Sequence, residues 1–94
     1  MKYTLAENKK KILQAFPTIK EHQFDELARY VDDRLTTGGF LRAILENRLF
    51  DAVACIDKTE SHVLFDMVVL IYSYVPSGCY GSREAVFHWL KRTE

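Results

Sequence analysis

Apolar residues recur at helical spacing through the first third of the chain and predict two helices. The first is expected between Thr4 and Pro17, because the residue before a proline disfavours the helical conformation. Thr4 and Glu7 match the capping-box pattern of a helix start, and Thr18 and Glu21 repeat that pattern for the second helix. The apolar stripes of the two helices are Leu5, Ile12, Leu13 and Phe16, followed by Phe24, Leu27, Ala28, Val31 and Leu35.

Two glycines, Gly38 and Gly39, predict the end of the second helix, since glycine adopts the left-handed conformation of a helix C-terminus at little cost. A third helix is then expected from Phe40 to Ile56. Its apolar face consists of Leu41, Ile44, Leu45, Leu49, Ala52, Val53 and Ile56. A further capping pattern that begins at Asp57 predicts a short turn into the fourth helix.

Residues 63–75 form the most apolar stretch of the chain. The β-branched Val68 and Ile71 would also suit a strand, but thirteen residues are long for a strand and the apolar positions do not alternate. We therefore predict a helix that is apolar around most of its circumference, and such a helix needs packing partners on most sides. We expect a second subunit to provide part of that cover, which makes the chain a homo-oligomer. The predicted oligomer interface is Val63, Met67, Leu70 and Tyr74.

Pro76 ends the fourth helix, and a turn-rich loop follows it. Ser82 is a favourable N-cap for a last helix, whose apolar side is Ala85, Val86, Trp89 and Leu90. Together these patterns predict a single all-α domain over residues 1–94, built as a compact bundle of four to five short helices.

The balance of charges argues against several classes of partner. Thirteen basic residues equal thirteen acidic ones, so no net field draws the protein to nucleic acid or to a membrane surface. The apolar run at 63–75 is shorter than the roughly 20 residues that span a bilayer. Two cysteines are too few for a disulfide framework and indicate a reducing compartment, and no apolar leader follows Met1. We expect a cytoplasmic protein.

The loop before the last helix is the strongest candidate for a ligand site. Glycines and a serine ahead of a helix N-terminus can present backbone N–H groups to an anion. Arg83 would add positive charge, and Tyr80 would stack on a nucleotide base. The same residues also fit a tight turn with a serine cap, so both interpretations stay open. The candidate ligand-binding residues are Ser77, Gly78, Tyr80, Gly81, Ser82 and Arg83.

The remaining chemistry-bearing residues predict neither catalysis nor metal binding. Cys79 is the single candidate nucleophile, because a helix starts three residues later, but a buried cysteine in a tight loop accounts for it as well. No catalytic residue and no cofactor is assigned. His22, His62 and His88 are scattered, without cysteines or carboxylates at metal-ligand spacing.

The turn at residues 36–39 also invites a helix-turn-helix interpretation. Arg42, Glu46 and Arg48 would then face DNA among many aliphatic residues, which is a poor surface for reading bases or contacting phosphates. A small DNA-binding regulator is kept as an alternative, and nucleic acid is not expected as the partner.

Residues 36–91 resemble a family of small helical proteins of phages and prophages. The resemblance is carried by Gly38-Gly39-Phe40-Leu41, Ala43-Ile44-Leu45-Glu46-Asn47, Leu49, Asp57, Ile71-Tyr72, Pro76-Ser77-Gly78-Cys79, Gly81-Ser82, Glu84 and Trp89. Two positions depart from the family, in which asparagine usually stands at the position of Ser73 and tryptophan often at that of Tyr80. The resemblance implies a phage or mobile-element origin, and thus the host-cell cytoplasm, but no particular activity.

Small phage accessory proteins often act by binding, so the leading hypothesis is a non-enzymatic accessory protein that serves in counter-defence. It would either cover a host defence protein, with the charged face of the second helix, or sequester an anionic nucleotide signal near residues 78–83. A structural or assembly component of the phage is the alternative.

Overall fold

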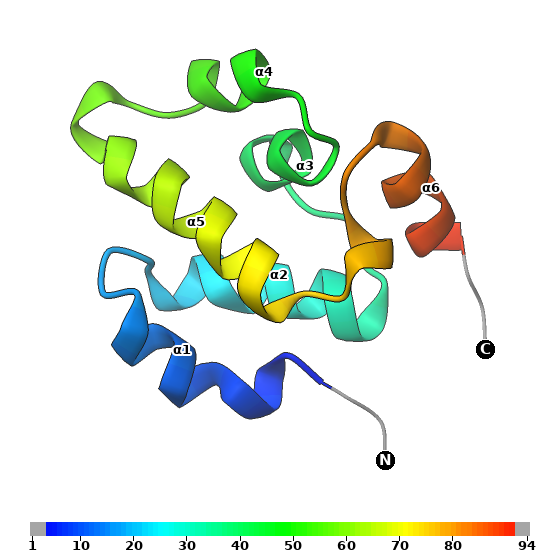
Figure 1. Ribbon diagram of the computed structural model, residues 1–94, viewed down its shortest axis with the longest axis horizontal. Coiled ribbons are helices and arrows are strands. Elements are labelled where there is room, and N and C mark those ends of the chain that lie inside the picture. Colours follow the sequence, from blue (N-terminus) through cyan, green and yellow to red (C-terminus); the bar gives the residue numbers. More distant parts are fainter. Residues whose placement is uncertain (1–3, 92–94) are drawn as a thin grey trace.

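Every regular element in the described part of the chain, residues 4–91, is helical, and no strand is found there. The computed structural model contains six α-helices and three 3₁₀ turns within those residues (Figure 1). In chain order they are η1 (Ala6–Asn8), α1 (Lys9–Ala15), α2 (Glu21–Asp33), α3 (Gly39–Leu45), α4 (Leu49–Ala54), η2 (Lys58–Glu60), α5 (Ser61–Tyr74), η3 (Ser77–Cys79) and α6 (Arg83–Lys91). The predicted all-α class is confirmed.

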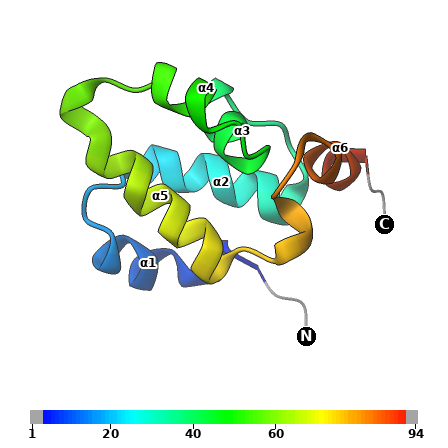
Figure 2. The same cartoon turned by 45° about the horizontal axis from the view of Figure 1, so that its top comes forward.

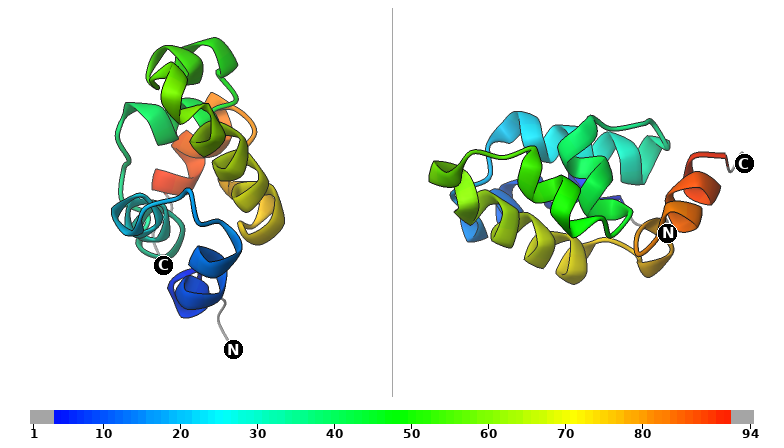
Figure 3. Two further views of the ribbon diagram at one scale, coloured as in Figure 1. Left: turned by 90° about the vertical axis from the view of Figure 1, so that its left-hand side faces the viewer. Right: turned by 90° about the horizontal axis from the view of Figure 1, so that it is seen from above.

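The core lies between α2 and α5, which form the middle of the molecule (Figures 2 and 3). Helix α1 lies on one side of this pair, and α3 and α4 lie on the other. The α2 stripe enters the core as predicted, except that Leu35 follows the helix and is exposed. The buried cluster consists of Leu5, Ile12, Ile19, Phe24, Leu27, Ala28, Tyr30, Val31, Leu41, Leu45, Met67, Leu70, Ile71, Val75, Cys79 and Val86.

The capping boxes predicted at Thr4 and at Thr18 are wrong, because other side chains supply the caps. At the first helix, the carboxylate of Asp32 on α2 accepts hydrogen bonds from the backbone N–H groups of Leu5 (2.7 Å) and Ala6 (3.0 Å). The Thr4 hydroxyl is buried without a hydrogen-bond partner among the described residues. A cap that comes from 26–27 residues away ties the N-terminal segment to α2.

Helix α2 begins at Glu21, three residues after the predicted cap. The Gln23 side chain accepts a hydrogen bond from the Lys20 backbone N–H at 2.8 Å. The Thr18 hydroxyl instead donates to the carboxylate of Asp66 on α5. Thr18 therefore joins two elements of the fold, and the helix start is set by Gln23.

The end of α2 is formed by Arg34 and not by the two glycines. Arg34 takes the left-handed conformation with φ 60°, and its guanidinium lies 3.8 Å from the ring centroid of Trp89. The Arg34 Nη1 group also donates to the Trp89 carbonyl oxygen at 3.3 Å. Gly38 precedes α3 as its N-cap, with an ordinary φ of −71°, and its N–H donates to the Glu26 carboxylate.

The predicted third helix over residues 40–56 is two helices, because the chain turns at Asn47. Asn47 has φ 62°, a left-handed conformation that asparagine tolerates better than most residues. The Arg48 N–H then donates to the Ala43 carbonyl at 2.7 Å, so the chain folds back and α4 packs against α3. The described residues therefore contain six α-helices, one more than the upper limit of the four to five predicted.

Helix α5 confirms the predicted helix over residues 63–75 and extends slightly beyond its start. The face predicted as an oligomer interface, however, is its core face. Met67 and Leu70 are fully buried, Val63 is buried, and Tyr74 is half buried against the core. Val63, Met67 and Leu70 therefore pack within a single chain, and only part of Tyr74 remains exposed. No helix in the described residues has the length and apolar character that crossing a membrane requires.

Candidate protein-binding surface

The exposed apolar side chains of α4 and α5 form the most conspicuous surface of the described residues. We define the α4–α5 face as Leu49, Phe50 and Val53 on α4 with Phe65, Val68 and Tyr72 on α5. Three of these are aromatic and stand well clear of the core, with Phe50 87%, Tyr72 78% and Phe65 69% exposed. Large rings at such exposures are costly to leave in water, and large exposed apolar patches mark interaction sites.

Helical spacing explains why α5 contributes a stripe to this face. Phe65, Val68 and Tyr72 follow one another at intervals of three and four residues, which places them on one side of the helix. The buried residues Met67 and Leu70 hold the opposite side in the core. Since α5 is apolar nearly all round, burying one side necessarily leaves another apolar side in solvent.

The short helix α4 supplies the other half of the face. It has only six residues, and Ala52 is the one that is buried. Leu49, Phe50 and Val53 therefore remain exposed although each is apolar. Because α4 turns back at Asn47, Leu49 comes to line the same hollow as Val68 and Tyr72 of α5.

A hollow of about 340 Å³ lies between the two halves of the face. Leu49 and Ala52 border it from α4, and Val68 and Tyr72 border it from α5. The other lining residues are Ala43, Ile44, Asn47, Arg48, Leu64, Ile71, Tyr80 and Gly81. The lining is mainly apolar, with tyrosines and one arginine at the rim, as is usual for sites that receive an organic group or a side chain.

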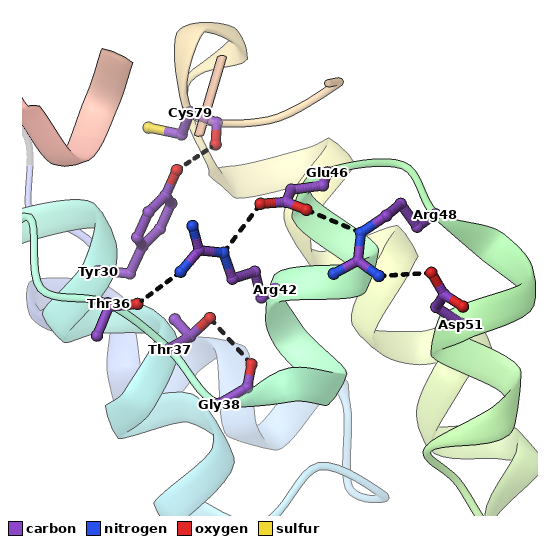
Figure 4. A network of polar contacts seen from close by, with 9 residues as sticks. All are labelled: Tyr30, Thr36, Thr37, Gly38, Arg42, Glu46, Arg48, Asp51 and Cys79. Carbon is purple, nitrogen blue, oxygen red and sulfur yellow. Dashed lines mark hydrogen bonds and ion pairs between the residues drawn. The ribbon is translucent and has the colours of Figure 1, made fainter. Parts of the chain in front are cut away.

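A network of ion pairs beside the hollow fixes the position of Arg48 (Figure 4). The buried Glu46 carboxylate accepts hydrogen bonds from Arg42 Nε at 2.9 Å and Arg48 Nε at 2.8 Å. Arg48 also binds Asp51 at 2.5 Å, and Arg42 donates to the Thr36 hydroxyl at 3.2 Å. Burial alone would raise the pKa of Glu46, but the two guanidinium groups outweigh it and hold that pKa below its ordinary value. The network thus joins α3 to α4 at the turn.

The loop after α5 is held in place by a buried tyrosine on α2. The Tyr30 hydroxyl donates to the Cys79 carbonyl oxygen at 2.6 Å, and Figure 4 shows this contact beside the ion-pair network. Burial raises the pKa of Tyr30, so the phenol stays protonated and remains a donor. Cys79 itself is fully buried, which leaves its thiol without access for a substrate. The geometry therefore does not favour the nucleophile hypothesis.

The six residues of the predicted anion site do not assemble into one. The Gly81 N–H donates to the Leu45 carbonyl at 2.8 Å, and the Ser82 hydroxyl accepts the Ala85 N–H at 3.0 Å as the predicted cap of α6. Tyr80 and Gly81 line the hollow of the α4–α5 face. Gly78 lines a separate shallow depression with His88, Trp89 and Lys91. Ser77 at the start of η3 and Arg83 at the start of α6 are exposed.

The geometry of the fold does not support the DNA-binding alternative. Arg42 and Arg48, which would have faced DNA, both pair with Glu46. Helix α3 ends at Leu45, so Glu46 and Arg48 lie beyond the helix that would have served for recognition. Among residues 4–91 no group of three or more His, Cys, Asp or Glu side chains is placed to hold a metal ion.

The chain matches no protein-family model, no curated protein and no solved structure. The resemblance to phage proteins therefore stays a prediction, and the function has to be argued from the surface itself. The residues of the α4–α5 face were missed from the sequence, although the spacing of Phe65, Val68 and Tyr72 is visible there.

Proposed function

We propose that this chain is a non-enzymatic, phage-type accessory protein that acts by binding another protein through its α4–α5 face. The observation that carries the proposal is that α4 and α5 together expose Phe50, Phe65 and Tyr72 and enclose an apolar hollow that Tyr72 borders. Aromatic residues are enriched in protein interfaces, and those that fit beside a pocket supply much of the binding energy.

The packing beneath the face supports binding without large rearrangement. The Glu46 network holds the turn between α3 and α4, and the Tyr30 hydroxyl holds the loop that carries Tyr80. A hollow whose walls are fixed before binding loses little conformational freedom when a partner enters it.

The setting comes from the resemblance to phage and prophage proteins, and in that setting the proposed action is counter-defence by covering a host defence protein. Sequestration of an anionic nucleotide has less support, because the Gly81 N–H and the Ser82 hydroxyl already have partners within the chain. The charged outer face of α2 also has less support than the α4–α5 face, since it combines charges of both signs.

Photo-crosslinking in the producing cell tests the proposal. A benzoylphenylalanine in place of Phe50 or Tyr72 is expected to form discrete protein adducts, whereas the same residue in place of Phe87 on α6 is not. Phe87 is a matched control because it is also aromatic and half exposed, at 52%. No adduct at positions 50 and 72, or equal adducts at all three positions, would overturn the assignment of this face.

A further inference from the structure

We infer that, until a target protein is bound, the α4–α5 face is occupied by a second copy of this chain, paired about a two-fold axis, which the target then displaces. The inference rests on the proposed function in one respect, namely that this face binds protein. It moves the predicted oligomer contact from the buried side of α5 to the stripe formed by Phe65, Val68 and Tyr72.

The exposed area is the first argument. Full burial of one aromatic side chain removes about 150–250 Å² from water. At exposures of 69–87% the three rings of the face therefore present on the order of 450 Å² of apolar surface, and Leu49, Val53 and Val68 extend it. The largest apolar patch of a typical monomer covers about 300–600 Å², and a standard interface takes about 800 Å² from each partner. The three rings alone fall within the monomer range. With Leu49, Val53 and Val68 included, the exposed apolar surface of α4 and α5 approaches the area that one partner contributes to a standard interface.

The shape of the face is the second argument. A two-fold interface uses the same patch on both copies, so that patch must contain a projection and a recess that fit each other. Phe50 is the most exposed large apolar residue of the described chain, and its neighbour Leu49 borders the hollow. An apolar cavity of about 150 Å³ is enough to hold a benzene ring, so the hollow of about 340 Å³ has room for Phe50 of a second copy.

Charge is the third argument, because it does not oppose the pairing of two copies. The chain carries 13 basic and 13 acidic residues, so two copies approach each other without net repulsion. At the rim of the face, the Arg48 charge is balanced by Glu46 and Asp51. A rim without excess charge of one sign does not select a partner of the opposite sign. The copy of the chain itself, by contrast, matches the face in both area and shape.

The mass of the purified full-length chain, measured by light scattering and sedimentation over a range of concentrations, tests the inference. We expect twice the chain mass of 11.0 kDa, with dissociation on dilution. Phe50→Lys and Tyr72→Lys are each expected to give the single-chain mass with an unchanged far-UV circular dichroism spectrum, because both side chains are exposed. Phe87→Lys on α6 is the matched control and is expected to remain a dimer.

A single-chain mass at every concentration would overturn the inference, and so would a dimer that survives both Phe50→Lys and Tyr72→Lys. The crosslinks described above separate this failure from failure of the proposed function. A monomer whose position 50 still crosslinks to a different protein overturns the pairing alone. A dimer whose crosslinks at positions 50 and 72 join only copies of this chain overturns the proposed function alone. A monomer that forms no crosslink at positions 50 and 72 overturns both.

Discussion

At the scale of single residues, the fold depends on side chains that satisfy backbone groups far away in sequence. Asp32 caps the N-terminal segment, Tyr30 binds the Cys79 carbonyl, and Arg34 ends α2 against Trp89. Each of these contacts joins two elements, so each fixes a position in space as well as a local conformation. This is why the local capping patterns at Thr4 and Thr18 did not predict the caps.

Replacement of the cap at the N-terminal segment is expected to reduce stability. Asp32→Ala leaves the N–H groups of Leu5 and Ala6 without their acceptor, and loss of an N-cap costs about 1 kcal/mol. The neighbouring Asp33→Ala is the control, because Asp33 is exposed at the C-terminal end of α2, where a negative charge is slightly unfavourable. Urea unfolding should show a lower midpoint for Asp32→Ala alone, and equal effects of the two changes would contradict the tertiary cap.

At the scale of elements, what could be predicted depended on whether the signal was local. Pro76 and Ser82 correctly marked the end of α5 and the start of α6, because both act through the adjacent backbone. The side of α5 that was predicted as the oligomer interface is mostly buried in the core. When a helix is apolar nearly all round, its sequence does not show which side is buried. Only the packing of the other helices decides that. The α4–α5 face was missed for the same reason.

The break between α3 and α4 leads to a prediction about Asn47. A left-handed conformation costs a residue other than glycine, asparagine or aspartate roughly 1–2 kcal/mol. Asn47→Gly is therefore expected to keep or slightly raise the free energy of unfolding, and Asn47→Ala to lower it by about 1 kcal/mol. Denaturant unfolding of the two variants measures this difference. If Asn47→Ala were as stable as Asn47→Gly, the left-handed turn would not be the feature that separates the helices.

At the scale of the whole molecule, stability should depend on pH through the buried Glu46. Its pKa in the folded chain lies below its ordinary value, which is about 4.3 in an unfolded chain. The carboxylate therefore contributes stability above the unfolded pKa, and that contribution is lost as the pH falls through the folded pKa. Proteins with this kind of pairing become less stable in acid because protonation releases both arginines.

Removing the charge of Glu46 tests that dependence. Glu46→Gln is expected to lower the free energy of unfolding at neutral pH by about 1–2 kcal/mol, at the lower end for charged hydrogen bonds, because Arg42 and Arg48 are partly exposed. The variant should also show a shallower loss of stability below about pH 4. Glu84→Gln on the exposed start of α6 is the control and should leave both quantities nearly unchanged. An identical acid profile for Glu46→Gln and the natural chain would contradict the role of this carboxylate.

The contact between Arg34 and Trp89 gives the molecule an internal optical reporter. Trp89 is the only tryptophan in the sequence, its indole N–H donates to the Tyr30 carbonyl at 3.0 Å, and the Arg34 guanidinium lies over its ring. Its fluorescence emission therefore depends on the packing of α6 against the end of α2. Because α6 follows the loop that closes one end of the hollow, a change in that emission during binding would show that occupation of the α4–α5 face is sensed at the other end of the chain.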